Sequence, residues 1–150
     1  MNQTFDFGFG PIPAHQHPNG GGWVADTAQV SPSAYVGPDA RVIGYALVTG
    51  NALVAGNAWV GGNAQVSGNA YVTDHAQVSG NAKVYGSAAV FSNAWVAGNA
   101  MLDSNATVSG NALVFGNAMV SGIASVTGNA SVAGDARIIG NARVTEGTHT

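Results

Sequence analysis

The side chains best suited to acid–base chemistry are four histidines, His15, His17, His75 and His149. A histidine acts as a general base when a neighbouring carboxylate orients it, and Asp74 directly precedes His75. Adjacent residues in a tight turn seldom face each other, however. We therefore favour a solvated turn histidine at position 75 and expect no catalytic residue in this chain.

His15 and His17 form the candidate metal site. In an extended segment, residues i and i+2 point to the same side, so a threefold assembly would bring six imidazoles towards one axis. Imidazole suits transition metals, and six such ligands would give octahedral coordination. The alternative interpretation, which we favour, is a pair of solvated histidines in a loose arm without any cofactor.

The composition argues against several kinds of partner. Charged residues make up only 7% of the 150 residues, against roughly a quarter in ordinary globular chains. Nucleic acids and anionic membranes are therefore poor candidate partners. No cysteine is present, which excludes disulfides and thiolate chemistry. The first residues lack the basic and apolar regions of a signal peptide, so we expect synthesis and retention in the cytoplasm.

A six-residue repeat dominates the chain. Alanine occurs at position 28 and at every sixth position up to 142, and Val, Ile or Leu follows two residues after each alanine. Six residues of an α-helix would advance about 600° and leave no apolar face. In a strand, by contrast, the two apolar residues point to one side. Glycine and asparagine between the strands tolerate positive φ at corners. Short antiparallel hairpins are the remaining alternative.

The repeat resembles that of the hexapeptide-repeat proteins, in the variant G-N-A-x-V-x, from Ala28 to Val144. This resemblance implies an all-β fold: a single-stranded, left-handed parallel β-helix with three hexads in each triangular coil. Twenty hexads would then give about six and two-thirds coils. We expect an irregular N-terminal arm or cap over residues 1–27, the β-helix over 28–145, and a C-terminal tail over 146–150.

Residues 18 apart should lie on the same face in successive coils, which sorts the outward residues into three faces. One face collects the apolar residues Trp59, Trp95, Leu113 and Phe115. A second begins with Tyr35, Leu53 and Tyr71 and then becomes polar. We expect these seven residues to form protein interfaces, because monomers rarely expose large apolar patches. The family resemblance favours a homotrimer.

The arm contains Phe5, Phe7, Phe9 and Ile12, with the three phenylalanines alternating as in a strand. It could cover the open first coil, whose edge would otherwise be unpaired. It could instead dock onto another structural protein by adding a strand. Both alternatives remain open.

The unbroken repeat favours a non-enzymatic structural or binding protein. Relatives that transfer acyl groups are expected to interrupt the repeat with a loop, and none occurs here. We therefore expect a rigid trimeric β-helix that decorates or bridges a larger assembly, such as a bacteriophage virion. The alternative is a hexapeptide-repeat acyltransferase that uses a CoA-linked donor.

Overall fold

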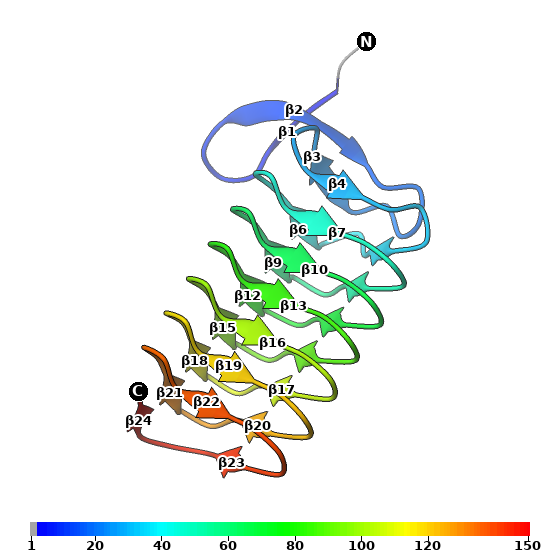
Figure 1. Cartoon of the computed structure of the whole chain (residues 1–150). Coiled ribbons are helices and arrows are strands. Elements are labelled where there is room, and N and C mark those ends of the chain that lie inside the picture. The colour runs from blue at the N-terminus through cyan, green and yellow to red at the C-terminus, as the bar shows by residue number, and fades with distance from the viewer. Residues whose placement is uncertain (1–2) are drawn as a thin grey trace.

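In the computed structural model, which describes residues 3–150, the chain winds into a stack of triangular coils with three parallel sheets as its sides (Figure 1). Each hexad supplies one two-residue strand, and the next hexad turns through a corner into the neighbouring sheet. The described residues contain strands and turns without any helix. The expected parallel β-helix is thus confirmed, with about seven coils.

Sheet 1 is the longest side and contains ten strands. In spatial order these are β1 (Thr4–Asp6), β2 (Pro11–Gln16), β3 (Trp23–Ala25), β6 (Arg41–Val42), β9 (Trp59–Val60), β12 (Gln77–Val78), β15 (Trp95–Val96), β18 (Leu113–Val114), β21 (Ser131–Val132) and β24 (Thr148–His149). The first three strands pair antiparallel, and all pairings from β3 onwards are parallel.

Sheets 2 and 3 contain seven parallel strands each. Sheet 2 consists of β4 (Gln29–Val30), β7 (Leu47–Val48), β10 (Gln65–Val66), β13 (Lys83–Val84), β16 (Met101–Leu102), β19 (Met119–Val120) and β22 (Arg137–Ile138). Sheet 3 consists of β5 (Tyr35–Val36), β8 (Leu53–Val54), β11 (Tyr71–Val72), β14 (Ala89–Val90), β17 (Thr107–Val108), β20 (Ser125–Val126) and β23 (Arg143–Val144).

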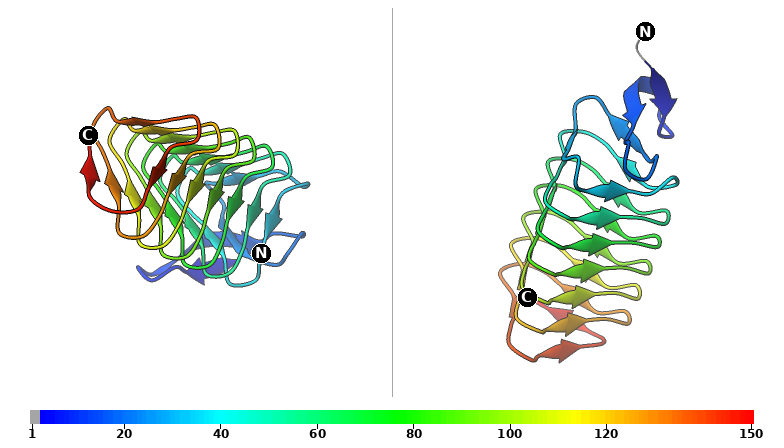
Figure 2. Two further views of the ribbon diagram at one scale, coloured as in Figure 1. Left: turned by 90° about the horizontal axis from the view of Figure 1, so that it is seen from below. Right: turned by 90° about the vertical axis from the view of Figure 1, so that its right-hand side faces the viewer.

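The inward alanine and valine of each hexad form one continuous core. From Ala34 to Val132 these inward residues are at most 1% exposed. Small side chains fill the narrow triangular interior at the density that protein cores require. The left view in Figure 2 shows the coils nested behind one another with a similar outline from coil to coil.

The corners are held together by hydrogen bonds between successive coils. The N–H of Asn51 donates to the carbonyl of Gly68, one coil later, at 2.8 Å, and Asn69 donates to Gly86 at 2.7 Å. Most corner glycines have φ near +65°. Asp74, Ser92 and Ser104 adopt the same left-handed conformation although they carry a side chain.

The β-helix extends beyond the expected 28–145 at both ends. At its start, β3 pairs parallel with β6, 18 residues later, although the segment before β3 lacks the repeat pattern. At its end, β24 pairs with β21, with Thr148 opposite Ser131, which is 17 residues away instead of 18. The one-residue shortening in the last coil hides this strand from the periodicity.

The N-terminal segment covers the first coil, as one of the two alternatives for the arm requires. It is regular rather than irregular, because β1 and β2 form a hairpin that continues sheet 1 past β3. The following loop covers the edge of sheet 3, since the N–H of Gly22 donates to the carbonyl of Val36 at 2.9 Å. Figure 1 shows the hairpin at one end of the stack and the C-terminus at the other.

Candidate functional site

The outer face of sheet 1 carries a row of aromatic and amide side chains. Gln77 on β12 lies directly between Trp59 on β9 and Trp95 on β15, because β12 pairs with both strands in register. This spacing of 18 residues confirms the face predicted from the sequence. Two strand spacings of about 4.8 Å separate the tryptophan backbones, so they lie about 10 Å apart.

Both indoles are held against this face. The Nε1 of Trp95 donates to the hydroxyl of Ser79 at 3.1 Å, and the side chain remains 47% exposed. The indole of Trp59 lies over Gly61, since a Cβ at position 61 would come within 3.2 Å of the Trp59 Nε1. What each tryptophan presents to solvent is therefore mainly the carbon surface of a fixed ring.

Two open hollows adjoin these rings. The larger, of about 420 Å³, is lined by Trp95, Ala97, Gly98, Leu113, Phe115 and Gly116. The second, of about 250 Å³, is lined by Ile43, Trp59, Gly61, Gly62, Gln77, Val78 and Ser79. The outward positions of sheet 1 from β9 to β21 hold no charged residue, so both hollows are electrically neutral.

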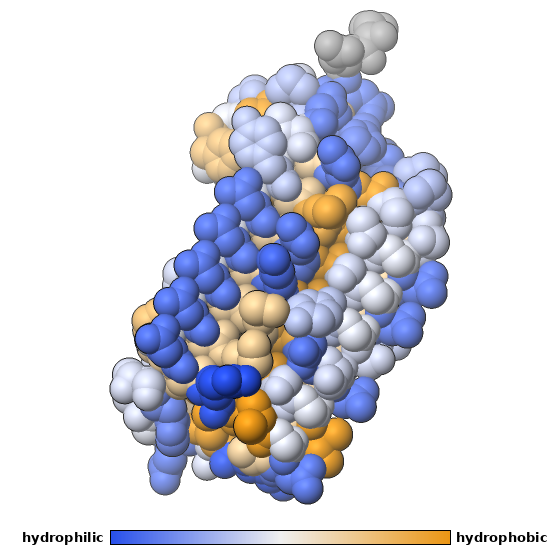
Figure 3. All heavy atoms as spheres, in the orientation of Figure 1, coloured by the Kyte–Doolittle hydropathy of each residue, from blue (hydrophilic) through white to orange (hydrophobic). Residues whose placement is uncertain are grey.

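A column of amides runs along the corner between sheets 1 and 2, beside the hollows. The Nδ2 of each asparagine donates to the Oδ1 one coil later, at 3.1 or 3.2 Å, through Asn63, Asn81, Asn99 and Asn117. Asn117 in turn donates to Asp135 at 3.0 Å. Figure 3 shows hydrophilic residues in rows along the edges of the stack. Each amide has a second N–H and a free lone pair for a ligand.

The predicted interface residues divide between two faces. Trp59, Trp95, Leu113 and Phe115 belong to sheet 1, whereas Tyr35, Leu53 and Tyr71 form a row on β5, β8 and β11 of sheet 3. Tyr71 is 50% exposed. No charged residue occupies the outward positions of sheet 3 from β5 to β20. The sequence pattern located both rows but did not show the hollows beside the aromatic rings of sheet 1.

The aromatic residues of the arm pack mostly against their own β-helix. Phe7 is buried in a cluster with Ala14 and Ala25, and Phe5 and Ile12 pack against the same cluster. The Phe5 ring stacks on Trp23 with centroids 4.6 Å apart and planes inclined by 16°. Phe9 alone is largely exposed, at 61%. Three of the four residues predicted to dock onto a partner thus cover the first coil.

The turn between β1 and β2 is fixed by a carboxylate. Asp6 Oδ1 accepts the N–H groups of Gly8 at 2.7 Å and of Gly10 at 2.9 Å. These backbone hydrogen bonds lower the pKa of Asp6 below its ordinary value of 3.8, because they favour the ionised form. The carboxylate therefore supports the turn and is already occupied by the protein's own backbone.

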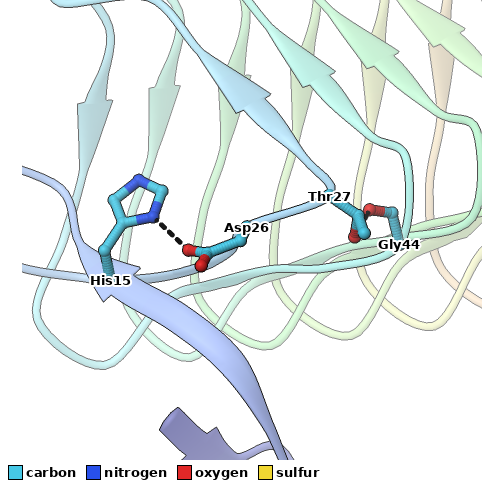
Figure 4. A network of polar contacts seen from close by, with 4 residues as sticks. All are labelled: His15, Asp26, Thr27 and Gly44. Carbon is cyan, nitrogen blue, oxygen red and sulfur yellow. Dashed lines mark hydrogen bonds and ion pairs between the residues drawn. The ribbon is translucent and has the colours of Figure 1, made fainter. Parts of the chain in front are cut away.

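His15 and His17 have different surroundings. His15 Nδ1 lies 2.8 Å from Asp26 Oδ1, in a half-exposed pair shown in Figure 4. His17 is 4% exposed, and its Nε2 lies 2.9 Å from the carbonyl oxygen of Ala34, so Nε2 must carry the proton that is donated. This hydrogen bond uses one of the two ring nitrogens of His17, so only Nδ1 could bind a metal.

His75 stands in the asparagine position of the corner between sheets 3 and 1. Asp74 does not form a hydrogen bond with it in the described structure, because its Oδ2 accepts the N–H of Ser92 at 3.0 Å. The interaction stabilises the left-handed conformation at the corner. It gives Asp74 a structural role and leaves His75 without the carboxylate orienter that general-base chemistry would use.

Sheet 2 carries a polar pair that the sequence pattern did not single out. The Tyr85 hydroxyl donates to Asp103 Oδ2 at 3.2 Å, one coil later, and the buried Asp103 Oδ1 has no hydrogen-bond partner. Partial burial raises the pKa of Tyr85, and the charge of Asp103 raises it further. Tyr85 and Asp103 are 18 residues apart, so the repeat period alone could have placed them side by side in adjacent coils.

Among residues 3–150, no group of three or more His, Cys, Asp or Glu side chains is placed to hold a metal ion. Within the same described part, no helix is long and apolar enough to span a membrane. These findings leave the neutral outer face of sheet 1 as the best-formed candidate site.

Comparison with known proteins agrees with this architecture. Residues 76–91 match the family model described as the YdcK beta solenoid repeat. Comparison with curated proteins gives no match. The matched segment spans β12, β13 and β14, one strand from each of the three sheets. The chain is therefore a hexapeptide-repeat parallel β-helix that contains a segment similar to the YdcK beta solenoid repeat.

Proposed function

We propose that this chain is a non-enzymatic structural and binding protein, whose stiff β-helix assembles into a homotrimer and decorates or bridges a larger assembly, such as a phage virion. The proposal rests on one observation: successive coils of the rod are joined by regular backbone hydrogen bonds, and two of its outer faces expose aromatic side chains among uncharged residues. Such surfaces are typical of protein and ligand contacts.

Sheet 3 is the face best suited to self-association. Its row of Tyr35, Leu53 and Tyr71 lies on adjacent strands, and small residues occupy most other outward positions. A neutral surface of this kind can be buried without leaving an unpaired charge. The resemblance to hexapeptide-repeat proteins favours three copies.

The rigidity of the rod supports a role in decoration or bridging. Every coil from the first to the last is bonded to its neighbour through all three sheets, and the core side chains are closely packed. A partner attached to one coil is therefore held at a fixed distance from a partner attached to another.

The experiment is a native mass measurement on the full chain and on the double variant Leu53→Asp, Tyr71→Asp. The unchanged chain should have three times the 14.9 kDa protomer mass. The variant should be monomeric, because three copies would have to bury unpaired carboxylates. Gln65→Asp on sheet 2 is the control and should leave the trimer intact. A monomeric unchanged chain, or a trimeric double variant, would contradict the proposal.

The alternative function, acyl transfer from a CoA-linked donor, has less support. It would need His75 as a base, and the neighbouring Asp74 carboxylate accepts the Ser92 amide instead of orienting the imidazole.

A further inference from the structure

We infer that the outer face of sheet 1 binds an unbranched, neutral, β-1,4-linked glycan that lies along the axis of the rod and stacks on Trp59 and Trp95. The inference rests on the proposed role as a binding protein that assembles through sheet 3 and leaves sheet 1 accessible. It adds the chemical class of the ligand.

The spacing of the tryptophans matches the repeat of such a glycan. All three tryptophans of the chain lie on sheet 1, at positions 23, 59 and 95, which are 36 residues or two coils apart. Two strand spacings amount to about 10 Å. In a flat β-1,4-linked ribbon, alternate sugar rings present the same face to one side, and two sugar units span a similar distance. Trp59 and Trp95 would therefore meet sugars i and i+2.

The first tryptophan shows how a flat ring sits on this row. Phe5 from the N-terminal hairpin stacks on Trp23 at 4.6 Å and 16°, and so covers it. Trp59 and Trp95 occupy the same position in later coils, but no aromatic ring of the described residues 3–150 stacks on them. A pyranose ring has an apolar face of C–H groups and can take the place that Phe5 takes on Trp23.

Polar groups lie where the sugar hydroxyls would be. Gln77 provides an exposed amide between the two rings, and Asn81 and Asn99 belong to the amide column along the edge of the same face. Amides donate and accept hydrogen bonds, as hydroxyl recognition requires. The outward positions of sheet 1 on β9, β12, β15, β18 and β21 carry no charged residue, which favours a neutral polymer over an anionic one.

The rings are also fixed before any ligand arrives. Trp95 is held by the hydrogen bond from its Nε1 to Ser79, and the indole of Trp59 lies over Gly61. Both contacts restrict the orientation of the rings. Because little side-chain freedom is left to lose, binding is less opposed by entropy. The hollow beside Trp95 continues to Leu113 and Phe115, which gives room for a further sugar unit.

The test uses the full chain with cellohexaose, chitohexaose and maltohexaose, each titrated by calorimetry and by tryptophan fluorescence. Cellohexaose or chitohexaose should bind and change the emission, since every tryptophan lies on sheet 1. Maltohexaose, which is α-linked and curved, should bind at least about tenfold more weakly. Trp59→Ala and Trp95→Ala should each weaken binding by about tenfold or more, as loss of one stacking ring does on aromatic platforms.

Gln65→Ala on sheet 2, away from both proposed contact faces, is the control and should keep full glycan affinity. Trp59→Phe should retain part of the affinity, because a smaller ring still stacks. The inference fails if neither β-linked hexasaccharide binds, if maltohexaose binds equally well, or if either alanine variant binds like the unchanged chain. It also fails if Trp95→Ala alters the assembly mass, since sheet 1 would then be a contact between copies. If the unchanged chain is monomeric and still binds the glycan, only the proposed trimer is refuted and the glycan site stands.

Discussion

Replacing Gly98 by alanine measures how closely successive coils are stacked at a corner. Gly98 has φ +64°, where a side chain costs roughly 1–2 kcal/mol. The added Cβ would also lie 2.8 Å from the nitrogen and 3.0 Å from the oxygen of Gly116 in the next coil. Such overpacking typically costs a further 1–3 kcal/mol or so. We expect Gly98→Ala to lower the free energy of unfolding by roughly 2–5 kcal/mol.

Gly140 provides the matched control. Its φ of +67° is nearly the same, but an added Cβ would have no other atom within 4 Å. Gly140→Ala should therefore show only the conformational cost of roughly 1–2 kcal/mol. The difference between the two variants isolates the contact between coils.

Urea unfolding followed by circular dichroism gives both values, provided that the slope against urea is unchanged. The reasoning is refuted if the two variants lose the same stability within about 0.5 kcal/mol, the usual error of such comparisons. Equal losses would mean that the next coil moves aside freely and that corner stacking adds little to stability.

Two further predictions concern buried polar groups. His17→Ala should lower the free energy of unfolding by about 1–3 kcal/mol in urea unfolding, because it removes a buried imidazole that is hydrogen-bonded to Ala34. His15→Ala, at a half-exposed position, should cost at most about 1 kcal/mol. A larger loss for His15→Ala than for His17→Ala would refute the structural role given to His17. Asp103→Asn should lower the pKa of Tyr85 towards its ordinary value of 10.0, seen by phenolate absorbance. A raised folded-state pKa stabilises the fold below the unfolded pKa, and this effect is lost as the pH rises through the folded pKa. The variant should therefore lose stability at pH values below the ordinary tyrosine pKa of 10.0 and lose little above the folded pKa; an unchanged Tyr85 titration would contradict this.

The regular part of the fold follows from the sequence because three hexads make one coil, so each strand residue must pair with the residue 18 positions away. Once Ala and Val point inward, Gln77 must pair with Trp59 on one side and Trp95 on the other, and the structure confirms both pairs. The assignment of outward residues to three faces follows from the same arithmetic. The candidate site on sheet 1 could therefore be located from the sequence as a row of residues.

The ends and the polar contacts could not be predicted in the same way. The cap depends on single interactions, such as the buried His17, that no periodicity repeats. The pattern also gives no indole orientation, so neither the seat of Trp59 over Gly61 nor the hollow beside Trp95 could be foreseen. Local sequence favoured a solvated His75 over a pair with Asp74, but it did not show that the Asp74 carboxylate accepts the backbone N–H of Ser92 in the next coil.

The corner hydrogen bonds that join successive coils run in one direction, which gives the rod an electrical polarity that its few charged residues do not supply. Each corner N–H points to a later coil and each accepting carbonyl to an earlier one, as from Asn51 to Gly68. The first coil therefore turns carbonyl oxygens outward, and the cap meets them with donors from His17, Asn19 and the Gly22 amide. Buried carbonyls need such partners. The cap also offers the Asn19 carbonyl to the N–H of Val36 at 3.1 Å. A segment that covered the last coil would instead need acceptors for the outward corner N–H groups, so the two ends of this rod ask for different caps.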